Sequence, residues 1–231
     1  QSAFDCGRLG PRFKSPQPVT AQAGNPHFLM DKYSLRRQLK AARNAMRPAE
    51  RRHAARASLR LALRHGLLLR AQRIGFYLPQ SGEFDVHPLL NQALCMRRDC
   101  YLPILPRRGR VMRFGRVGRN TRMSPNRYGI PEPLDAKPLR ARQLDLLLMP
   151  LVGFDLQGHR LGMGGGYYDA TLAFMRHRRL WRKPRLVGVA YECQRVEALP
   201  HEPWDMPLDA VLTERRLHRF DSNHPKPHSP R

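Results

Sequence analysis

The chain has few acidic residues for its size. Its 231 residues include 18 Asp and Glu against 42 Lys and Arg, which gives a formal net charge of +24 at pH 7. An excess of this size attracts polyanions of any kind. Nucleic acids, nucleotides and acidic metabolites are therefore all candidate partners, and the charge alone does not choose among them.

Cysteine is also scarce. The chain has four cysteines, Cys6, Cys95, Cys100 and Cys193, and no two of them form a CxxC pair. That spacing is typical of structural zinc sites and of redox pairs, so neither is predicted. Thiols without a partner suit a reducing compartment, and we expect a cytoplasmic protein.

Long apolar runs are absent as well. No stretch approaches the roughly 20 apolar residues of a membrane span, and the first 30 residues lack the apolar core of a secretory signal. We expect residues 1–29, rich in Pro, Gly, Gln and Ser, to be a disordered leader, with Met30 as a candidate start, and residues 220–231 to be a disordered tail. Residues 30–219 are predicted to form a single domain, monomeric and without a membrane partner.

Apolar periodicity predicts helices and strands in alternation. Helices are expected at residues 34–46, 48–66, 87–99 and 167–180. Strands are expected at residues 73–79, 100–105, 111–117, 144–155, 185–192 and 209–215, with a loop at 124–133. This alternation predicts an α/β fold, a layered and mostly parallel sheet flanked by helices.

A dense glycine cluster follows the longest apolar run, in the stretch GHRLGMGGGYYDAT at residues 158–171. Its glycines match neither the dinucleotide-binding GxGxxG motif nor the P-loop, because Tyr167 stands three positions after Gly164. A glycine loop between a buried strand and a helix exposes backbone N–H groups, and the helix end adds positive charge. This indicates an anion site, with Asp169 placed to hold a Mg²⁺ that bridges phosphates. The same residues are equally typical of a tight turn with Asp169 as a helix cap.

The longer segment LLLMPLVGFDLQGHRLGMGGGYYDATL, residues 146–172, resembles the signature of the 5-formyltetrahydrofolate cyclo-ligase (5,10-methenyltetrahydrofolate synthetase) family. Further stretches resemble the family in the same order along the chain: KYSLRRQLKAAR at 32–43, IGFYLPQSGEFD at 74–85, RYGIPEP at 127–133 and WDMPLDAVLTE at 204–214. The resemblance covers residues 32 to 215. It implies a fold related to ribose-5-phosphate isomerase and CoA-transferase domains, with Mg²⁺ as cofactor and ATP as co-substrate.

The resemblance also implies a reaction, the conversion of 5-formyltetrahydrofolate to 5,10-methenyltetrahydrofolate with release of ADP and phosphate. The formyl oxygen attacks the γ-phosphate of ATP, and N10 then attacks the activated carbon before phosphate leaves. The substrate supplies both nucleophiles, so the protein mainly aligns two ligands and neutralises developing charge.

Site residues carry over from the family motifs by position. The residues implied for ATP are Lys32, Arg36, Arg160, Leu161, Gly162, Met163, Gly164, Gly165, Gly166, Tyr167 and Tyr168. Those implied for the folate are Leu78, Glu83 and the loop residues Met163, Gly164, Gly165, Gly166 and Tyr167. The two residues implied for Mg²⁺ are Asp169 and Asp205. Tyr128, like Tyr167, offers an aromatic face for the rings of the folate, although core packing accounts equally well for both tyrosines.

Two features leave other interpretations open. Some eukaryotic relatives carry basic residues inside the glycine loop where this chain has Met163 and Gly165, so backbone N–H groups and outlying arginines such as Arg160 have to compensate. The arginine-rich helices also suit a nucleic-acid-binding protein, although no such motif is present and we expect no specific nucleic acid as partner. A sugar-phosphate isomerase or a CoA-transferase on the same fold is the other alternative, since a fold does not determine chemistry.

Overall fold

The computed structural model describes residues 31–80, 82–134, 137–177, 183–202 and 205–220. The expected leader at 1–29 and the expected tail from residue 221 onward lie outside these ranges. Phe220, the first residue of that expected tail, belongs to the described chain: its backbone N–H donates to the Asp209 carbonyl, and its ring packs against the core.

Helices and strands are interspersed along the described chain, with β2 to β8 in succession between α3 and α4. The α-helices are α1 (Lys32–Asn44), α2 (Pro48–Arg64), α3 (His87–Cys95) and α4 (Tyr167–Leu172), and the 3-10 turns are η1 (Ala141–Gln143), η2 (Ala173–His177) and η3 (Glu192–Gln194). The strands are β1 (Arg73–Gly75), β2 (Asp99–Ile104), β3 (Arg113–Val117), β4 (Met123–Pro125), β5 (Pro131–Pro133), β6 (Leu146–Pro150), β7 (Gly153–Phe154), β8 (Arg160–Leu161), β9 (Arg185–Val189), β10 (Ala210–Leu212) and β11 (Leu217–Arg219).

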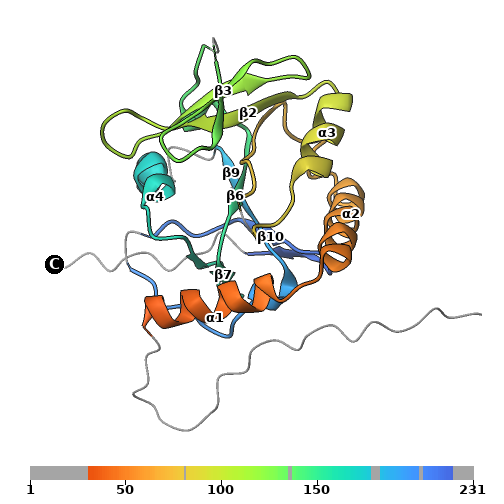
Figure 1. The fold of residues 1–231 in the computed structure, drawn as a ribbon, viewed down its shortest axis with the longest axis vertical. Helices are drawn as coiled ribbons and strands as arrows, with labels where there is room; N and C mark the ends of the chain where they lie inside the picture. The colour runs from red at the N-terminus through yellow and green to blue at the C-terminus, as the bar shows by residue number, and fades with distance from the viewer. Residues whose placement is uncertain (1–30, 81, 135–136, 178–182, 203–204, 221–231) are drawn as a thin grey trace, which may run out of the picture.

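A seven-stranded sheet forms the centre of the molecule (Figure 1), in the order β11-β10-β9-β6-β1-β2-β3. The strands from β10 to β2 in this order pair in parallel, whereas β11 and β3 pair antiparallel at the two edges. The predicted α/β architecture with a mostly parallel sheet is therefore confirmed.

Strand β6 is buried on both faces, which explains its continuous apolar sequence. Leu146 and Leu148 pack in the cluster that contains residues of α2 and α3. Leu147 and Met149 point the other way, into the cluster that contains Leu172 of α4. The sheet is thus the middle of three layers.

The expected strand at 144–155 is in fact two strands. Strand β6 ends at Pro150, which has no N–H to donate to a sheet ladder. The chain then leaves the large sheet, and β7 pairs antiparallel with β8 in a small separate hairpin. This hairpin leads directly into the glycine loop at residues 162–166.

Three other expectations need correction. The loop expected at 124–133 contains a short hairpin, because β4 and β5 pair antiparallel on either side of a turn at Asn126–Gly129. The helix expected at 167–180 is α-helical only to Leu172. The Thr171 hydroxyl donates to the Tyr167 carbonyl at 2.6 Å, and such a bond weakens a helix. Residues 178–180 of the expected helix lie outside the described ranges. Strand β11 was not expected at all.

Helix α1 crosses the end of the sheet beside the β7–β8 hairpin (Figure 1). Its apolar stripe, Leu35 and Leu39, packs against Val152 and Leu161 in a cluster of its own. The Asp31 carboxylate caps the helix by accepting the Ser34 N–H at 2.8 Å. Burial of one stripe leaves the basic face of α1 free to reach the glycine loop.

Candidate active site

The predicted site residues lie where parallel strands end. In an open α/β sheet, ligands bind outside the carboxyl ends of the strands. Strand β1 leads into the segment with Leu78 and Glu83, and β6 leads through the β7–β8 hairpin into the glycine loop. Because β1 and β6 are parallel neighbours in the sheet, these two segments leave the carboxyl ends of the strands side by side.

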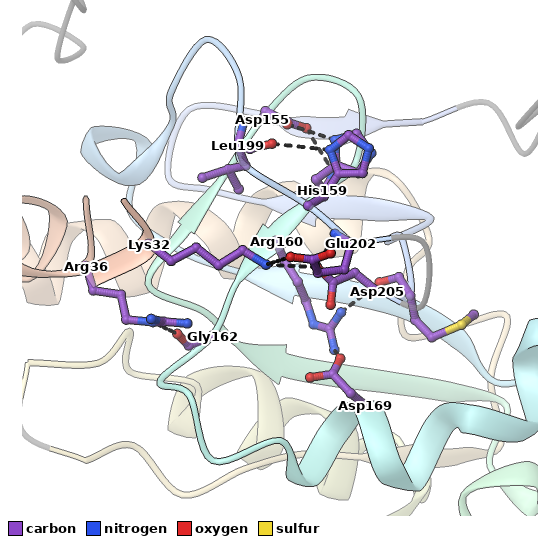
Figure 2. A network of polar contacts seen from close by, with 12 residues as sticks. Lys32, Arg36, Asp155, His159, Arg160, Gly162, Asp169, Leu199, Glu202 and Asp205 are labelled. Carbon is purple, nitrogen blue, oxygen red and sulfur yellow. Dashed lines mark hydrogen bonds and ion pairs between the residues drawn. The ribbon is translucent and has the colours of Figure 1, made fainter. Parts of the chain in front are cut away.

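Lys32 forms ion pairs with two carboxylates, those of Asp205 and Glu202 (Figure 2). Its ammonium is 3.5 Å from Asp205 Oδ2 and 3.7 Å from Glu202 Oε1. The Glu202 N–H also donates to Asp205 Oδ2 at 2.9 Å, which fixes the orientation of that carboxylate. The Lys32 and Glu202 side chains are 31% and 46% exposed, so water screens the pair and Lys32 can exchange it for a ligand at little cost.

Arg36 lies one helical turn after Lys32 and contacts the glycine loop directly. Its Nε–H donates to the Gly162 carbonyl at 2.8 Å. Figure 2 shows the side chains of Lys32 and Arg36 leaving α1 toward the same region. Both side chains therefore have partners in the fold, Arg36 at the glycine loop and Lys32 at the two carboxylates.

Arg160 is held on two sides. One Nη donates to the Met206 carbonyl at 2.7 Å, and the other forms an ion pair with Asp169. The Arg160 side chain is only 6% exposed, whereas that of Asp169 is 38% exposed. Asp169 does lie in the first turn of α4, as predicted, but its partner is a side-chain cation rather than the helix end.

The glycine loop needs glycine at two positions for its conformation. Gly164 and Gly166 have φ values of +98° and +69°, a region that other residues rarely adopt. At Gly162 a Cβ would meet no atom within 4 Å, so the protein itself does not require glycine there. Helix α4 has only six residues, so its dipole is small, and side chains from elsewhere add to the positive charge at the loop.

Tyr128 and Tyr167 lie together outside the core. Their hydroxyls are 3.0 Å apart, and an Nη of Arg127 donates to the Tyr167 hydroxyl at 2.7 Å. Hydrogen bonds with Tyr128 and Arg127 lower the pKa of Tyr167. Tyr128 is 58% exposed, so core packing, the alternative considered for both tyrosines, does not account for this one.

The folate candidates that follow β1, Leu78 and Glu83, are less exposed than Tyr128. Leu78 is partly buried against the core, and Glu83 Oε2 accepts the Gln80 N–H at 3.0 Å. Burial raises the pKa of Tyr168; the charge of Glu83 raises it further, and Arg160 lowers it. Glu83 and Arg160 therefore both act on the Tyr168 hydroxyl, one from each segment.

Two predicted ATP residues have core positions. The Leu161 side chain is buried against α1, and Tyr168 packs partly on the core below α4. Their backbones are therefore the parts that remain for a ligand at the loop. Met163, by contrast, is 53% exposed at the tip of the loop.

Asp155 and His159 form a structural cluster behind the loop (Figure 2). The buried Asp155 carboxylate accepts the backbone N–H groups of Gln157, His159 and Leu199, and its Oδ2 lies 2.9 Å from His159 Nδ1. The His159 ring stacks on that of His201 at 3.7 Å. His159 is thus a packed residue and not the exposed side chain that its glycine-flanked position suggests.

Three further residues of the described chain lie at this site without a role assigned from the sequence motifs. Glu202 joins Asp205 at Lys32, and its only local signal is its place three residues earlier. Arg127 reaches Tyr167, and Arg110 lies over Gly166, where a Cβ would be 3.2 Å from its Nη1. Arg110 belongs to a loop without periodicity, so no local pattern could have selected it, whereas Arg127 opens the RYGIPEP stretch that resembles the family.

The acidic residues suit a metal that arrives with phosphates. Within the described residues, no group of three or more His, Cys, Asp or Glu side chains converges as a metal site. Asp169 and Asp205 each have a cationic partner, Arg160 and Lys32. Mg²⁺ is usually held by one or two carboxylates plus substrate phosphates, and this donor set fits that mode.

Comparisons with known proteins agree with this geometry. The model of the 5-formyltetrahydrofolate cyclo-ligase family matches residues 29–214. The 5-formyltetrahydrofolate cyclo-ligase of Escherichia coli is 35% identical over 182 residues, which cover 78% of this chain and 98% of the relative. That of Haemophilus influenzae is 40% identical over 147 residues, 62% of this chain and 75% of the relative.

Solved structures extend the agreement to the fold. The NMR structure of 5,10-methenyltetrahydrofolate synthetase from Aquifex aeolicus superposes with a TM-score of 0.71 at 30% identity, and covers 85% of this chain and 97% of the other. The basic face of α1, the strand-end glutamate and the glycine loop all lie within the matched residues. The chain therefore belongs to the 5-formyltetrahydrofolate cyclo-ligase family.

Proposed function

We infer that this chain is a 5-formyltetrahydrofolate cyclo-ligase, which uses ATP to convert 5-formyltetrahydrofolate to 5,10-methenyltetrahydrofolate. Family membership supports the reaction. The observation that carries the assignment of the site is that Arg36, from the first helix, donates to Gly162 of the glycine loop more than a hundred residues later, while Lys32 of the same helix lies against Glu202 and Asp205. This arrangement favours the cyclo-ligase over an isomerase or a transferase built on the same fold.

On the nucleotide side, we propose that Lys32 and Arg36 bind phosphates of ATP. Lys32 exchanges its exposed carboxylate partners for phosphate oxygens, and Arg36 keeps its bond to the Gly162 carbonyl while its Nη groups face the ligand. Residues 160 to 168 wrap the triphosphate mainly through backbone N–H groups. Gly162 has open space around it, which supports close approach of the ligand.

On the folate side, we propose that Tyr128 and Tyr167 stack on the rings of the substrate, with Leu78 and the loop residues Met163 to Gly166 completing the wall. Glu83 accepts hydrogen bonds from the donor-rich edge of the pterin. The exposure of Tyr128 and the position of Glu83 at the strand end support this arrangement. The loop then separates the two ligands and lets the formyl oxygen reach the γ-phosphate.

We propose Asp169 and Asp205 as the side chains that hold Mg²⁺ when ATP binds. The ion would neutralise charge on the phosphate oxygens during transfer. Arg160 holds Asp169 in place and is itself fixed by the Met206 carbonyl. The Glu202 N–H does the same for Asp205.

The formyl group on N5 is an amide, so its carbon is a poor electrophile until its oxygen becomes a leaving group. Transfer of the γ-phosphoryl group to that oxygen does this, and attack by N10 closes the ring as phosphate leaves. The cations around the glycine loop stabilise the charge that develops on the phosphoryl oxygens. The protein supplies no nucleophile of its own.

One assay tests the reaction. Purified protein is mixed with 5-formyltetrahydrofolate, Mg²⁺ and ATP, and the near-ultraviolet absorbance of the methenyl product is followed. We expect a rise that depends on ATP. An unchanged absorbance with active substrate present would contradict the assignment.

We also propose a cytoplasmic, monomeric enzyme. Among the described cysteines, Cys95, Cys100 and Cys193 are free thiols, which suits a reducing compartment. Within the described part of the chain, no helix combines the length and the apolar character that a membrane span needs.

Replacement of Tyr167 tests the folate side. Tyr167→Phe keeps the ring but removes the hydroxyl that contacts Arg127 and Tyr128. Loss of these bonds costs on the order of 1 kcal/mol, which corresponds to a rise of about 5-fold in KM for the folate, with KM for ATP unchanged. Steady-state kinetics measure both values. The matched control is Tyr33→Phe, a 70% exposed tyrosine of α1; equal values for the two variants would refute the role of the hydroxyl.

A further inference from the structure

The glycine loop carries no basic side chain of its own, yet four arginines from elsewhere in the described part of the chain surround it. Arg36 contacts the Gly162 carbonyl, Arg160 pairs with Asp169, and Arg127 donates to the Tyr167 hydroxyl. Arg110 is the fourth. Within the described residues its guanidinium has no hydrogen bond or ion pair, so its charge is not used by the fold.

Arg110 lies against one end of the loop. An added Cβ at Gly166 would be 3.2 Å from its Nη1 and 3.6 Å from its Cδ, so the side chain covers the Gly166 backbone. Arg36 lies beside Gly164 in a similar way, because an added Cβ at Gly164 would be 3.9 Å from the Cζ of Arg36. Two guanidinium groups therefore flank a stretch of three residues.

The backbone beneath Arg110 is anchored, although its side chain is exposed. The Met112 N–H donates to the Thr171 hydroxyl at 2.9 Å, which ties the turn between β2 and β3 to α4. The other Nη of Arg127 donates to the Arg107 carbonyl at 3.3 Å, so Arg127 joins the same turn to Tyr167. These contacts hold the backbone of the turn in place before a ligand arrives, which reduces the rearrangement that the Arg110 side chain needs to meet developing charge.

The two ends of the loop face different ligands under the proposed function. The Gly162 end meets Arg36, a proposed nucleotide cation, and the Gly166 end leads into Tyr167, a proposed folate residue. The group that passes from one ligand to the other must lie between these ends. Arg110 is the cation on the folate side of that path.

We propose that Arg110 binds the γ-phosphoryl group and stabilises it during transfer, in place of basic side chains within the loop. This inference rests on the proposed function and adds a residue to it. Arg110 acts on the γ-phosphate and not on the α- or β-phosphate, because Arg36 occupies the other end of the loop. A planar guanidinium suits this role, since it presents parallel N–H donors to two phosphoryl oxygens.

The test compares Arg110→Ala with Arg108→Ala, a control in the same exposed turn. Within the described residues, the Arg108 side chain has no hydrogen bond or ion pair with the loop or its tyrosines. We expect Arg110→Ala to lower kcat about 100-fold, the usual cost of losing one preorganised donor to developing charge. Arg108→Ala should keep the wild-type kcat. Arg110→Lys restores the charge but not the paired donors, and should recover kcat to within about 10-fold of wild type.

Nucleotide binding without folate gives a second readout that does not need turnover. Calorimetry should show Arg110→Ala binding ATP about 10-fold more weakly than wild type and ADP with unchanged affinity, because only ATP has the γ-phosphate. Equal weakening for both nucleotides, or a kcat equal to that of Arg108→Ala, would overturn the inference. If the wild-type protein bound ATP but formed no methenyl product, the proposed function would fail, while the difference between ATP and ADP would still decide the role of Arg110.

Discussion

Asp169→Asn is expected to lower kcat about 100-fold while the protein stays folded. The substitution keeps the size of the side chain but removes the charge that pairs with Arg160 and that we propose to hold Mg²⁺. Losses of this order are usual when a group that positions transferring phosphoryl charge is removed. Steady-state assays at saturating ATP measure the effect, and circular dichroism verifies the fold.

The dependence on Mg²⁺ separates two roles for Asp169. If the carboxylate holds the ion, the Mg²⁺ concentration that gives half-maximal rate rises in Asp169→Asn; if it only orients Arg160, kcat falls and that concentration stays the same. We expect the first outcome, and the second would contradict the metal assignment. Asp99→Asn is the matched control, because Asp99 also pairs with an arginine but lies at the amino end of β2, away from the carboxyl ends of the strands where the site lies.

Asp155→Ala is expected to destabilise the protein by about 4 kcal/mol. Asp155 is 1% exposed, and its carboxylate accepts three backbone N–H groups besides lying next to His159 Nδ1. Each buried N–H left without an acceptor costs about 1–3 kcal/mol, so the combined loss is among the largest expected for a single substitution. Urea unfolding measures the change. Asp155→Asn, which keeps one acceptor oxygen, should lose about half as much.

This substitution should also affect the active site. The bond from the Leu199 N–H to Asp155 fixes the start of the segment that carries Glu202 and Asp205. We therefore expect KM for ATP to rise in Asp155→Asn even where the protein is fully folded. Asp99→Ala removes only a surface pair, whose arginine is 67% exposed, and should change the free energy of unfolding by less than about 1 kcal/mol. A stability of Asp155→Ala close to that of this control would refute the structural role.

Much of the fold could be predicted because its signals are local. The apolar stripe of α1 with Leu35 and Leu39 and the continuous apolar run of β6 each follow from a period that lies within one element. The errors came where a contact outside the element decided the outcome. The chain leaves the large sheet after Pro150 because β7 finds its partner in β8, and that pairing has no signature in the run itself.

The site was predictable only in part, for the same reason. Lys32, the loop glycines and Asp169 stand in motifs that can be read along the chain, and the structure places them together. Leu161 stands in the same motif, but its side chain packs on α1 and is not available to a ligand. A motif thus selects a segment, and packing decides which of its side chains face outward.

The sequence by itself determined the α/β class, the order of most elements and the family, because periodicity and motif spacing are properties of adjacent residues. Only the tertiary structure decided which charges gather at the glycine loop. Arg36 and Gly162 are 126 positions apart, and Arg110 and Arg127 come from two different turns. Such contacts depend on how the sheet arranges distant segments, and no local pattern records that arrangement. The positive charge that the loop lacks in its own sequence is supplied in this way by the fold.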